Sequence, residues 1–464
     1  MSSNLLAILG TAGNALEAFQ QALTVTQSNI SNSSTPGYAS QRVNLEAQPL
    51  DVASGLAGGV AAGGLIDSRD QYAEEQVQRQ TQTLGQFTAQ AQATGAIQSL
   101  FDVSGTSGIS ADLSSLLQSF SAWSVTPSDA TARQSVIDSA STVASDIQGL
   151  AGSLSGNAQQ LDSSIASTTA QINSVAAQVQ AYNTQRLTET APDPGEEAKL
   201  YSALDNLSQL TNFSTVTQAD GTVTVLLGGG SPLVMGSQQY ALSATSSASG
   251  AQILDSQGND ITSQIASGQL GGMLDTRNRV LGSMMGDSQQ MGTVNQFAAA
   301  LADTVNQILE SGTVSSASGA AAGTALFTYD SPTDAASTLV ANPAITASQL
   351  APVDSSGNSN GNANQLAGLE SAPVTTLEGM SLTQYFGQIT SSIGEENQTA
   401  TDNQTSQQQV VAQATSLVNQ ASGVSLDNEA VNVLQFQRAY QAAAQMVTAV
   451  NNCINSILSL IQPA

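Results

Sequence analysis

Histidine is missing from the 464 residues of this sequence, and the single cysteine is Cys453. Histidine is the commonest general base and the commonest metal ligand, and one thiol cannot build a disulfide framework or a thiolate metal site within the chain. The sequence therefore predicts no catalytic site, no bound metal and no cofactor. We expect Cys453 itself to be a small buried apolar residue.

Basic residues are also scarce, since nine Lys and Arg stand against 35 Asp and Glu and give a net charge of −26 at pH 7. Without a basic surface to displace counterions from phosphate, nucleic-acid binding is excluded. No apolar run is long enough for membrane insertion, and residues 1–10 lack the basic start and long apolar core of a cleaved secretory signal. We expect a chain that is either cytoplasmic or exported without a cleaved signal peptide.

Aromatic residues make up only 4% of the sequence and charged residues 9%, while Ala, Ser, Gln, Thr and Gly dominate. Side chains this small favour slender helical packing over one thick globular core. The length is enough for about three domains.

The last forty residues carry the clearest pattern in the chain. Apolar side chains recur there at alternating spacings of three and four, which is typical of a coiled-coil seam. The expected members of this seam are Val433, Phe436, Tyr440, Ala443, Val447, Val450, Ile454, Ile457 and Ile461. Ser425 is placed to cap the helix. A helix of this length with one apolar seam needs a partner.

The partner is expected at the other end of the chain, where the same alternation occurs. Its members are Leu5, Leu9, Ala12, Leu16, Phe19, Leu23, Thr26 and Ile30. The matched periods predict that the two terminal helices pair as a coiled coil, although periodicity alone leaves open that each seam is the buried face of a globular helix. Two helices without a third layer are marginal in water, so we expect the termini to be largely unfolded in the free monomer.

The middle of the chain is predicted to be mainly helical, with Trp123 as a core anchor. Asp220-Gly221 lies between two β-rich runs and predicts a hairpin over 213–226. The Gly- and Ala-rich residues 51–64 are expected to form an irregular link, and residues 313–374 to be rich in loops. The predicted fold is mainly α and elongated, with paired terminal helices, a helical-bundle middle domain and a small β-hairpin section.

A compact motif follows the first helix, with Pro-Gly suited to a type II turn. It consists of Asn29, Asn32, Thr35, Pro36, Gly37 and Tyr38. This motif resembles the N-terminal motif of bacterial flagellar rod, hook and hook-associated proteins, and residues 422–442 resemble their C-terminal motif. Residues 267–278 and 297–312 are similar to the hook-associated protein 1 family rather than to rod or hook proteins.

The resemblance implies a structural subunit at the junction between flagellar hook and filament, which assembles through its terminal coiled-coil helices. The partners that it implies are further copies in a ring or helical layer, the hook protein, hook-associated protein 3 and a flagellar export chaperone. It also implies an extracellular place in the flagellum. The seam residues are then the assembly interface.

The resemblance further implies a division into domains. Residues 1–50 with 420–464 would form the terminal coiled coil of an inner tube. Residues 51–312 with 375–419 would form a helical middle domain, with a β section near 213–265. The segment 313–374 leaves room only for a reduced or absent outer domain.

Other functions remain as alternatives. A hook or rod protein is disfavoured by residues 268–278, and a secreted adhesin-like binding module would need a β-rich repeat array that the sequence lacks. A glycosidase needs two converging carboxylates. Neighbours on a helix point about 100° apart, so the pairs Glu74-Glu75, Glu196-Glu197 and Glu395-Glu396 do not converge, and we expect no enzyme.

Overall fold

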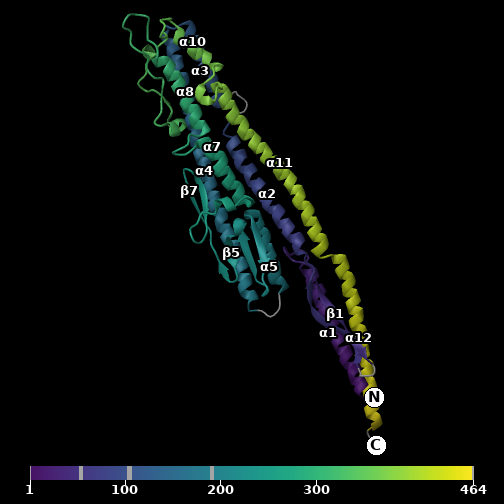
Figure 1. Ribbon diagram of the computed structural model, residues 1–464. Helices are drawn as coiled ribbons and strands as arrows, with labels where there is room; N and C mark the ends of the chain where they lie inside the picture. The colour runs from purple at the N-terminus through teal and green to yellow at the C-terminus, as the bar shows by residue number, and fades with distance from the viewer. Residues whose placement is uncertain (1, 52–55, 102–106, 189–192, 462–464) are drawn as a thin grey trace.

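The computed structural model describes residues 2–51, 56–101, 107–188 and 193–461. The molecule is elongated, with long helices along its length, and both ends of the chain lie at the same tip (Figure 1). We distinguish a terminal rod, made by residues 2–67 and 423–461, from the body that lies between them in sequence. Among the described residues, no helix is long and apolar enough to cross a membrane.

The terminal rod contains two helices and a hairpin. Helix α1 (Ser2–Ser31) packs along α12 (Leu426–Ile461), as the matched seams predict. Strands β1 (Gln41–Asp51) and β2 (Leu56–Asp67) form an antiparallel hairpin that also packs on α1. The irregular link expected over 51–64 is therefore wrong for residues 56–64, and residues 52–55 lie outside the described part.

Glycine explains why a strand can lie so close to this helix. Gly59 has a φ of +122°, and a Cβ at this position would clash with Thr11 of α1. The Gly- and Ala-rich composition of β2 thus permits a close approach between the hairpin backbone and α1.

The body is organised around α4 (Ala130–Arg186), a helix of 57 residues. Five further long helices belong to the body. They are α2 (Gln71–Gln98), α3 (Gly108–Val125), α5 (Pro194–Leu210), α8 (Thr293–Glu310) and α11 (Leu382–Ser422). The carboxylates of Asp70, Asp129 and Asp193 accept hydrogen bonds from backbone N–H groups and so cap α2, α4 and α5.

One continuous hydrophobic core runs through the body, and its buried members extend from Ala89 to Ile393. Trp123 is fully buried, as predicted, and its indole N–H donates to the carbonyl of Pro127 at 3.2 Å. None of the described residues of the terminal rod belongs to this core.

Polar contacts join the long helices α2 and α11. Gln407 donates to the side chain of Gln80 at 2.7 Å, and Asn397 donates to Gln98 at 2.6 Å. Gln404 donates to Thr88 at 3.2 Å. Small and amide side chains thus hold these helices together, in keeping with a composition poor in aromatics.

The β section lies against one side of α4 (Figure 1). Strands β3 (Phe213–Thr217) and β4 (Val223–Leu227) pair around Asp220-Gly221 and confirm the predicted hairpin. Strands β5 (Pro232–Met235) and β6 (Gln238–Gln239) complete a four-stranded sheet, and β7 (Ser243–Ser247) pairs with β8 (Gly250–Leu254). Buried Asn183 of α4 donates to the carbonyls of Val223 and Gly236 at 2.8 Å and holds the sheet on the helix.

A run of polar residues connects α6 (Gly268–Asp275) to α7 (Gly282–Met285) through a π-helical turn, Thr276–Leu281. Arg277 pairs with Asp162 of α4 at 2.8 Å, and Arg279 pairs with Glu396 of α11 at 2.7 Å. Two positions of this turn, separated by one residue, therefore tie α4 and α11 to one segment.

The segment 313–374 consists mostly of loops and turns, with short elements between them. It contains β9 (Phe327–Thr328), α9 (Ala335–Thr338), β10 (Val340–Ala341) and α10 (Gly361–Ala367). Phe327, Leu350 and Leu366 are buried in the core of the body. Because these elements are short, they leave no periodic pattern in the sequence.

Candidate assembly interface

The predicted seam residues lie on α1 and α12 with different degrees of burial. Ala12, Thr26, Ala443 and Val450 are buried. Ile30, Tyr440 and Ile457 are exposed, and the side chain of Ile461 lies outside the described residues. The remaining members are half-buried: Leu5, Leu9, Leu16, Phe19, Leu23, Val433, Phe436, Val447 and Ile454. In the isolated chain the seam is only partly covered.

The most buried row of α1 is not the predicted one. Ala18, Ala22, Val25 and Asn29 follow the same spacing of four and three, but on a neighbouring face. The β1–β2 hairpin causes this shift, because it packs on α1 beside α12 and forms a third layer. The premise of a bare two-helix rod is therefore wrong.

Cys453 is exposed, and the expectation that it would be buried is wrong for this chain. Helix α12 packs chiefly against α1, so most of its circumference stays in solvent. Leu426, Val431 and Leu434 are exposed by 54%, 62% and 56% on this uncovered surface.

Asn29 joins the two helices of the rod to the start of its hairpin. Its side-chain amide donates to the carbonyl of Gln41 at 2.8 Å and to the carboxylate of Glu429 at 3.0 Å. Its side-chain oxygen accepts from the hydroxyl of Tyr38 at 2.9 Å and from the backbone N–H of Gln41 at 3.0 Å. This one buried amide thus joins α1, the motif loop and the first turn of α12.

The other motif residues shape the loop after α1. Asn32 donates to the carbonyl of Ser28 at 3.0 Å and accepts from the Thr35 hydroxyl at 3.2 Å. Thr35 and Pro36 are exposed. Gly37 has a φ of +74°, as the predicted turn requires, and a Cβ there would clash with the backbone of Ala198 in α5.

Arg69 is the charged centre of the joint between rod and body. Its side chain is 6% exposed, pairs with Glu74 at 2.9 Å and donates to the carbonyl of Gly37 at 2.6 Å. The guanidinium carbon lies 3.6 Å from the centre of the Tyr201 ring, a cation–π contact with α5. Arg69 therefore holds the motif loop, α2 and α5 together.

Carboxyl groups outnumber bases around this joint. Burial raises the pKa of Glu74, and the attraction of Arg69 opposes that rise. Burial also raises the pKa of Asp205 to about 6 and that of Tyr201 to about 12. Arg69 thus compensates a group of acids that would be costly to bury alone.

Ser422, at the end of α11, connects the C-terminal part of the chain to the joint through hydrogen bonds. Its carbonyl accepts from the backbone N–H of Ser40 at 2.9 Å, and its hydroxyl accepts from the backbone N–H of Asp70 at 3.2 Å. The side chain of Ser68 also donates to this carbonyl, at 3.3 Å. The joint is thus built from four chain segments, which fixes how the rod leaves the body.

Sequence reasoning found the motif by resemblance but missed Arg69, Ser422 and Glu429 as parts of the joint. The hydrogen bond between Asn29 and Glu429 spans 400 residues, so only folding reveals it. The rod presents apolar surface to which another protein can bind. The hydrogen bonds and ion pairs of the joint fix the position of the rod relative to the body. Among the described residues, no group of three or more Cys, Asp or Glu could hold a metal ion.

Comparison with known proteins gives matches along the chain. The family described as the flagellar hook-associated protein FlgK helical domain matches residues 94–327. The C-terminal family of flagellar basal body rod FlgEFG proteins matches residues 418–460, and the flagella basal body rod protein family matches residues 9–38. The last two matches fall on the terminal rod and the end of α11.

Individual proteins give matches of the same kind. Flagellar hook-associated protein 1 of Bacillus subtilis (strain 168) is 25% identical over 500 residues, which cover 97% of each chain. The solved structure of the flagellar hook junction protein FlgK from Burkholderia pseudomallei is 24% identical with a TM-score of 0.49, and the match covers 55% of this chain and 46% of that one.

Proposed function

Because this chain belongs to the family of the flagellar hook-associated protein FlgK, we propose that it is a structural subunit of the bacterial flagellum at the junction between hook and filament. It functions by self-assembly, and the terminal rod is the part that contacts neighbouring copies. The observation that carries this proposal is the exposed apolar surface of the rod.

Charge is distributed unevenly between the two parts of the molecule. Residues 1–67 and 423–464 hold six of the 35 acidic residues and two of the nine basic ones. The rod therefore has a net charge of −4 and the rest of the chain −22. Per residue the rod is less charged than the body, so copies repel one another less when they approach rod to rod.

The exposed apolar surface is concentrated in the same place. More than half of the exposed large apolar side chains belong to the rod, although it has only about a quarter of the residues. Such a concentration of exposed apolar side chains indicates an interaction site. The proposed interface comprises the predicted seam residues together with the uncovered face of α12.

A groove in the rod offers a place for a neighbour's side chain. It has a volume of about 370 Å³ and lies between α1, β2 and α12, with Phe19, Val60 and Met446 in its lining. Leu434 projects from a different face of α12, eight residues before Ala442 in the groove, or about 12 Å along the axis. A projection and a groove on different faces fit head-to-tail contacts, which generate a ring or a helix of copies.

Membership of this family also implies assembly with other flagellar components. We propose that the chain meets the hook protein on one side and hook-associated protein 3 on the other. We further propose extracellular placement, export without a cleaved signal peptide and delivery by an export chaperone. A catalytic role is not proposed, because the sequence has no histidine and the family is structural.

Labelled protein on isolated flagella tests the location. The label goes on the body through Ser153→Cys in a Cys453→Ser background, and the variant is expressed in a flagellated bacterium that lacks its own junction protein. We expect one fluorescent spot between hook and filament. Label along the whole filament, or none on flagella, would contradict the proposal.

The seam itself is tested by Ile454→Asp, which places a carboxylate at a half-buried seam position. An unpaired charge buried by packing costs several kcal/mol. Cells should then build hooks but release filament subunits into the medium, as measured by electron microscopy and blotting of the culture supernatant. Asn403 is exposed on α11 in the body, away from the proposed interface, so Asn403→Asp is the control and should leave filaments normal. Normal filaments with both variants would argue against the seam.

A further inference from the structure

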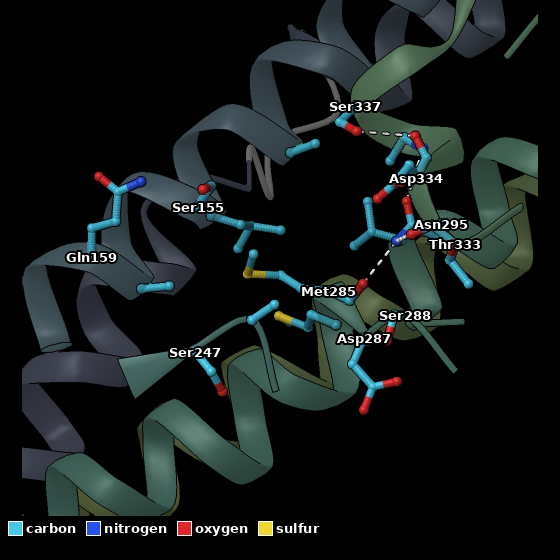
Figure 2. Close-up of a pocket in the computed structure, with 18 of the residues that line it drawn as sticks. Ser155, Gln159, Ser247, Met285, Asp287, Ser288, Asn295, Thr333, Asp334 and Ser337 are labelled. Atoms are coloured by element: carbon cyan, nitrogen blue, oxygen red, sulfur yellow. Dashed lines mark hydrogen bonds between the residues drawn. The ribbon is translucent and has the colours of Figure 1, made fainter. Parts of the chain in front are cut away.

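A cleft on the body lies outside the rod and the joint. It has a volume of about 650 Å³ and opens between α4, the tip of the β7–β8 hairpin and the turn that joins α7 to α8. Figure 2 shows this cleft, with the side chain of Met285 extending into its centre. This cleft takes no part in the proposed assembly of copies through the terminal rod.

The floor of the cleft is apolar. Leu154, Ala158, Met284 and Val294 line it and are otherwise buried in the body. Methionine side chains are flexible and polarizable, so a floor that contains Met284 and Met285 adapts to apolar groups of different shape. The cleft is therefore suited to one inserted aliphatic or aromatic side chain.

Hydrogen bonds hold the walls in place. Buried Asn295 donates to the carbonyls of Met285 and Thr333 at 2.7 and 2.6 Å and so ties two walls together (Figure 2). Arg277, paired with Asp162, donates to the carbonyl of Ser247 at 2.9 Å and fixes the hairpin tip. A cleft with fixed walls is preformed for a ligand.

The rim of the cleft is negative. Asp287 and Asp334 lie on it, and the only base in the lining, Arg277, is already paired. The backbone N–H groups of Gln289 and Gln290 donate to the Asp287 carboxylate and hold its pKa below the usual range. A ligand that covers the apolar floor must therefore bring positive charge to the rim.

We propose that this cleft binds a segment of a partner protein in which an aliphatic or aromatic side chain is flanked by Lys or Arg. A second copy of this chain is a poor match. Of its nine bases only Arg277 and Arg279 lie close together in sequence, and they flank Asn278, so no segment of this chain has an aliphatic or aromatic residue between two bases. The partner is a different, more basic protein.

Fluorescein-labelled peptides test the proposal on the full-length protein by fluorescence anisotropy. The probes are Gly-Lys-Leu-Lys-Gly, Gly-Lys-Ser-Lys-Gly and Gly-Glu-Leu-Glu-Gly. The leucine peptide should bind about tenfold tighter than the serine peptide, because burying an aliphatic side chain is worth at least that factor. The glutamate peptide should not bind. Equal binding of the two lysine peptides would mean attraction to net charge alone and would overturn the proposal.

Paired variants locate the binding. Ser155→Trp obstructs the cleft and should abolish the preference for leucine, whereas Ser153→Trp, on an exposed part of the same helix, should keep it. Asp287→Asn with Asp334→Asn should weaken binding of both lysine peptides. The matched double variant Glu395→Gln with Asp402→Asn, which removes two exposed charges from α11, should weaken it less.

A photo-crosslinking measurement covers the case in which Ser155→Trp does not fold. The leucine peptide is made with a diazirine analogue of leucine and irradiated with the unmodified protein. Crosslinks should map to 154–159 or 284–288. Crosslinks spread over other surfaces would refute the proposed site.

Discussion

At the scale of single residues, Arg69 contacts three parts of the joint at once. It is buried against Glu74, Tyr201 and the carbonyl of Gly37. We predict that Arg69→Ala lowers the free energy of unfolding by about 3–5 kcal/mol, because it leaves buried carboxylates without their counter-charge. Urea denaturation followed by circular dichroism measures the loss.

The pH dependence of the destabilisation by Arg69→Ala shows whether Arg69 stabilises the joint through its charge or through packing. Burial already raises the pKa of Glu74 and Arg69 opposes the rise, so removing Arg69 raises this pKa further. The destabilisation should be largest at neutral pH and shrink as Glu74 takes up a proton in mildly acidic solution. The surface pair of Arg79 with Glu75 is the control, and Arg79→Ala should cost about 0.5 kcal/mol or less. A loss that does not change with pH would assign the role of Arg69 to packing alone.

At the scale of elements, helices α3 and α4 meet through two acids. A hydrogen bond with Asp146 raises the pKa of Asp112 to about 6. The folded state thus binds this proton more tightly than the unfolded chain, and the stability gained from it is lost as pH rises through about 6. We predict that Asp112→Asn stabilises the protein at pH 7.5 by about 1 kcal/mol, after allowance for solvent screening, and has little effect near pH 4.

Thermal or urea unfolding across this pH range checks the prediction. Exposed Asp138 on α4 provides the control, because Asp138→Asn should give a difference that does not depend on pH in this way. Several acids with lowered pKa, such as Asp255 and Asp354, lose their contribution only below about pH 4, so they do not mask the effect. Destabilisation by Asp112→Asn at pH 7.5 would show that the two acids do not repel.

The elements differ in how well their sequence predicts them. The terminal helices and their pairing were predictable because a long seam of constant period is hard to produce otherwise, and Asp220-Gly221 marks its hairpin directly. The β1–β2 hairpin was not, since its Gly- and Ala-rich strand is specified by contact with α1 rather than by alternation. The joint was predictable only as a motif, because Asn29 reaches Glu429 and Arg69 reaches Tyr201 through tertiary contacts.

At the scale of the whole molecule, stability is unequal between rod and body. The continuous core lies entirely within the body, whereas on α12 the only apolar side chains that are buried are Ala443 and Val450 among the described residues. Even with the hairpin as a third layer, the rod holds together through small side chains, partly covered seams and the Asn29 cluster. Regions with so few buried apolar contacts open locally before the rest of the protein.

We therefore predict that the rod of the free monomer opens independently of the body and becomes stable only when neighbouring copies cover its apolar surface. Brief protease treatment of monomer should remove about residues 1–50 and 420–464 and leave a helical body, as measured by mass spectrometry. Assembled flagella under the same treatment should keep these segments, because the rods are then covered. If the ends of the free monomer resist digestion as strongly as the body, folding of the rod does not depend on assembly.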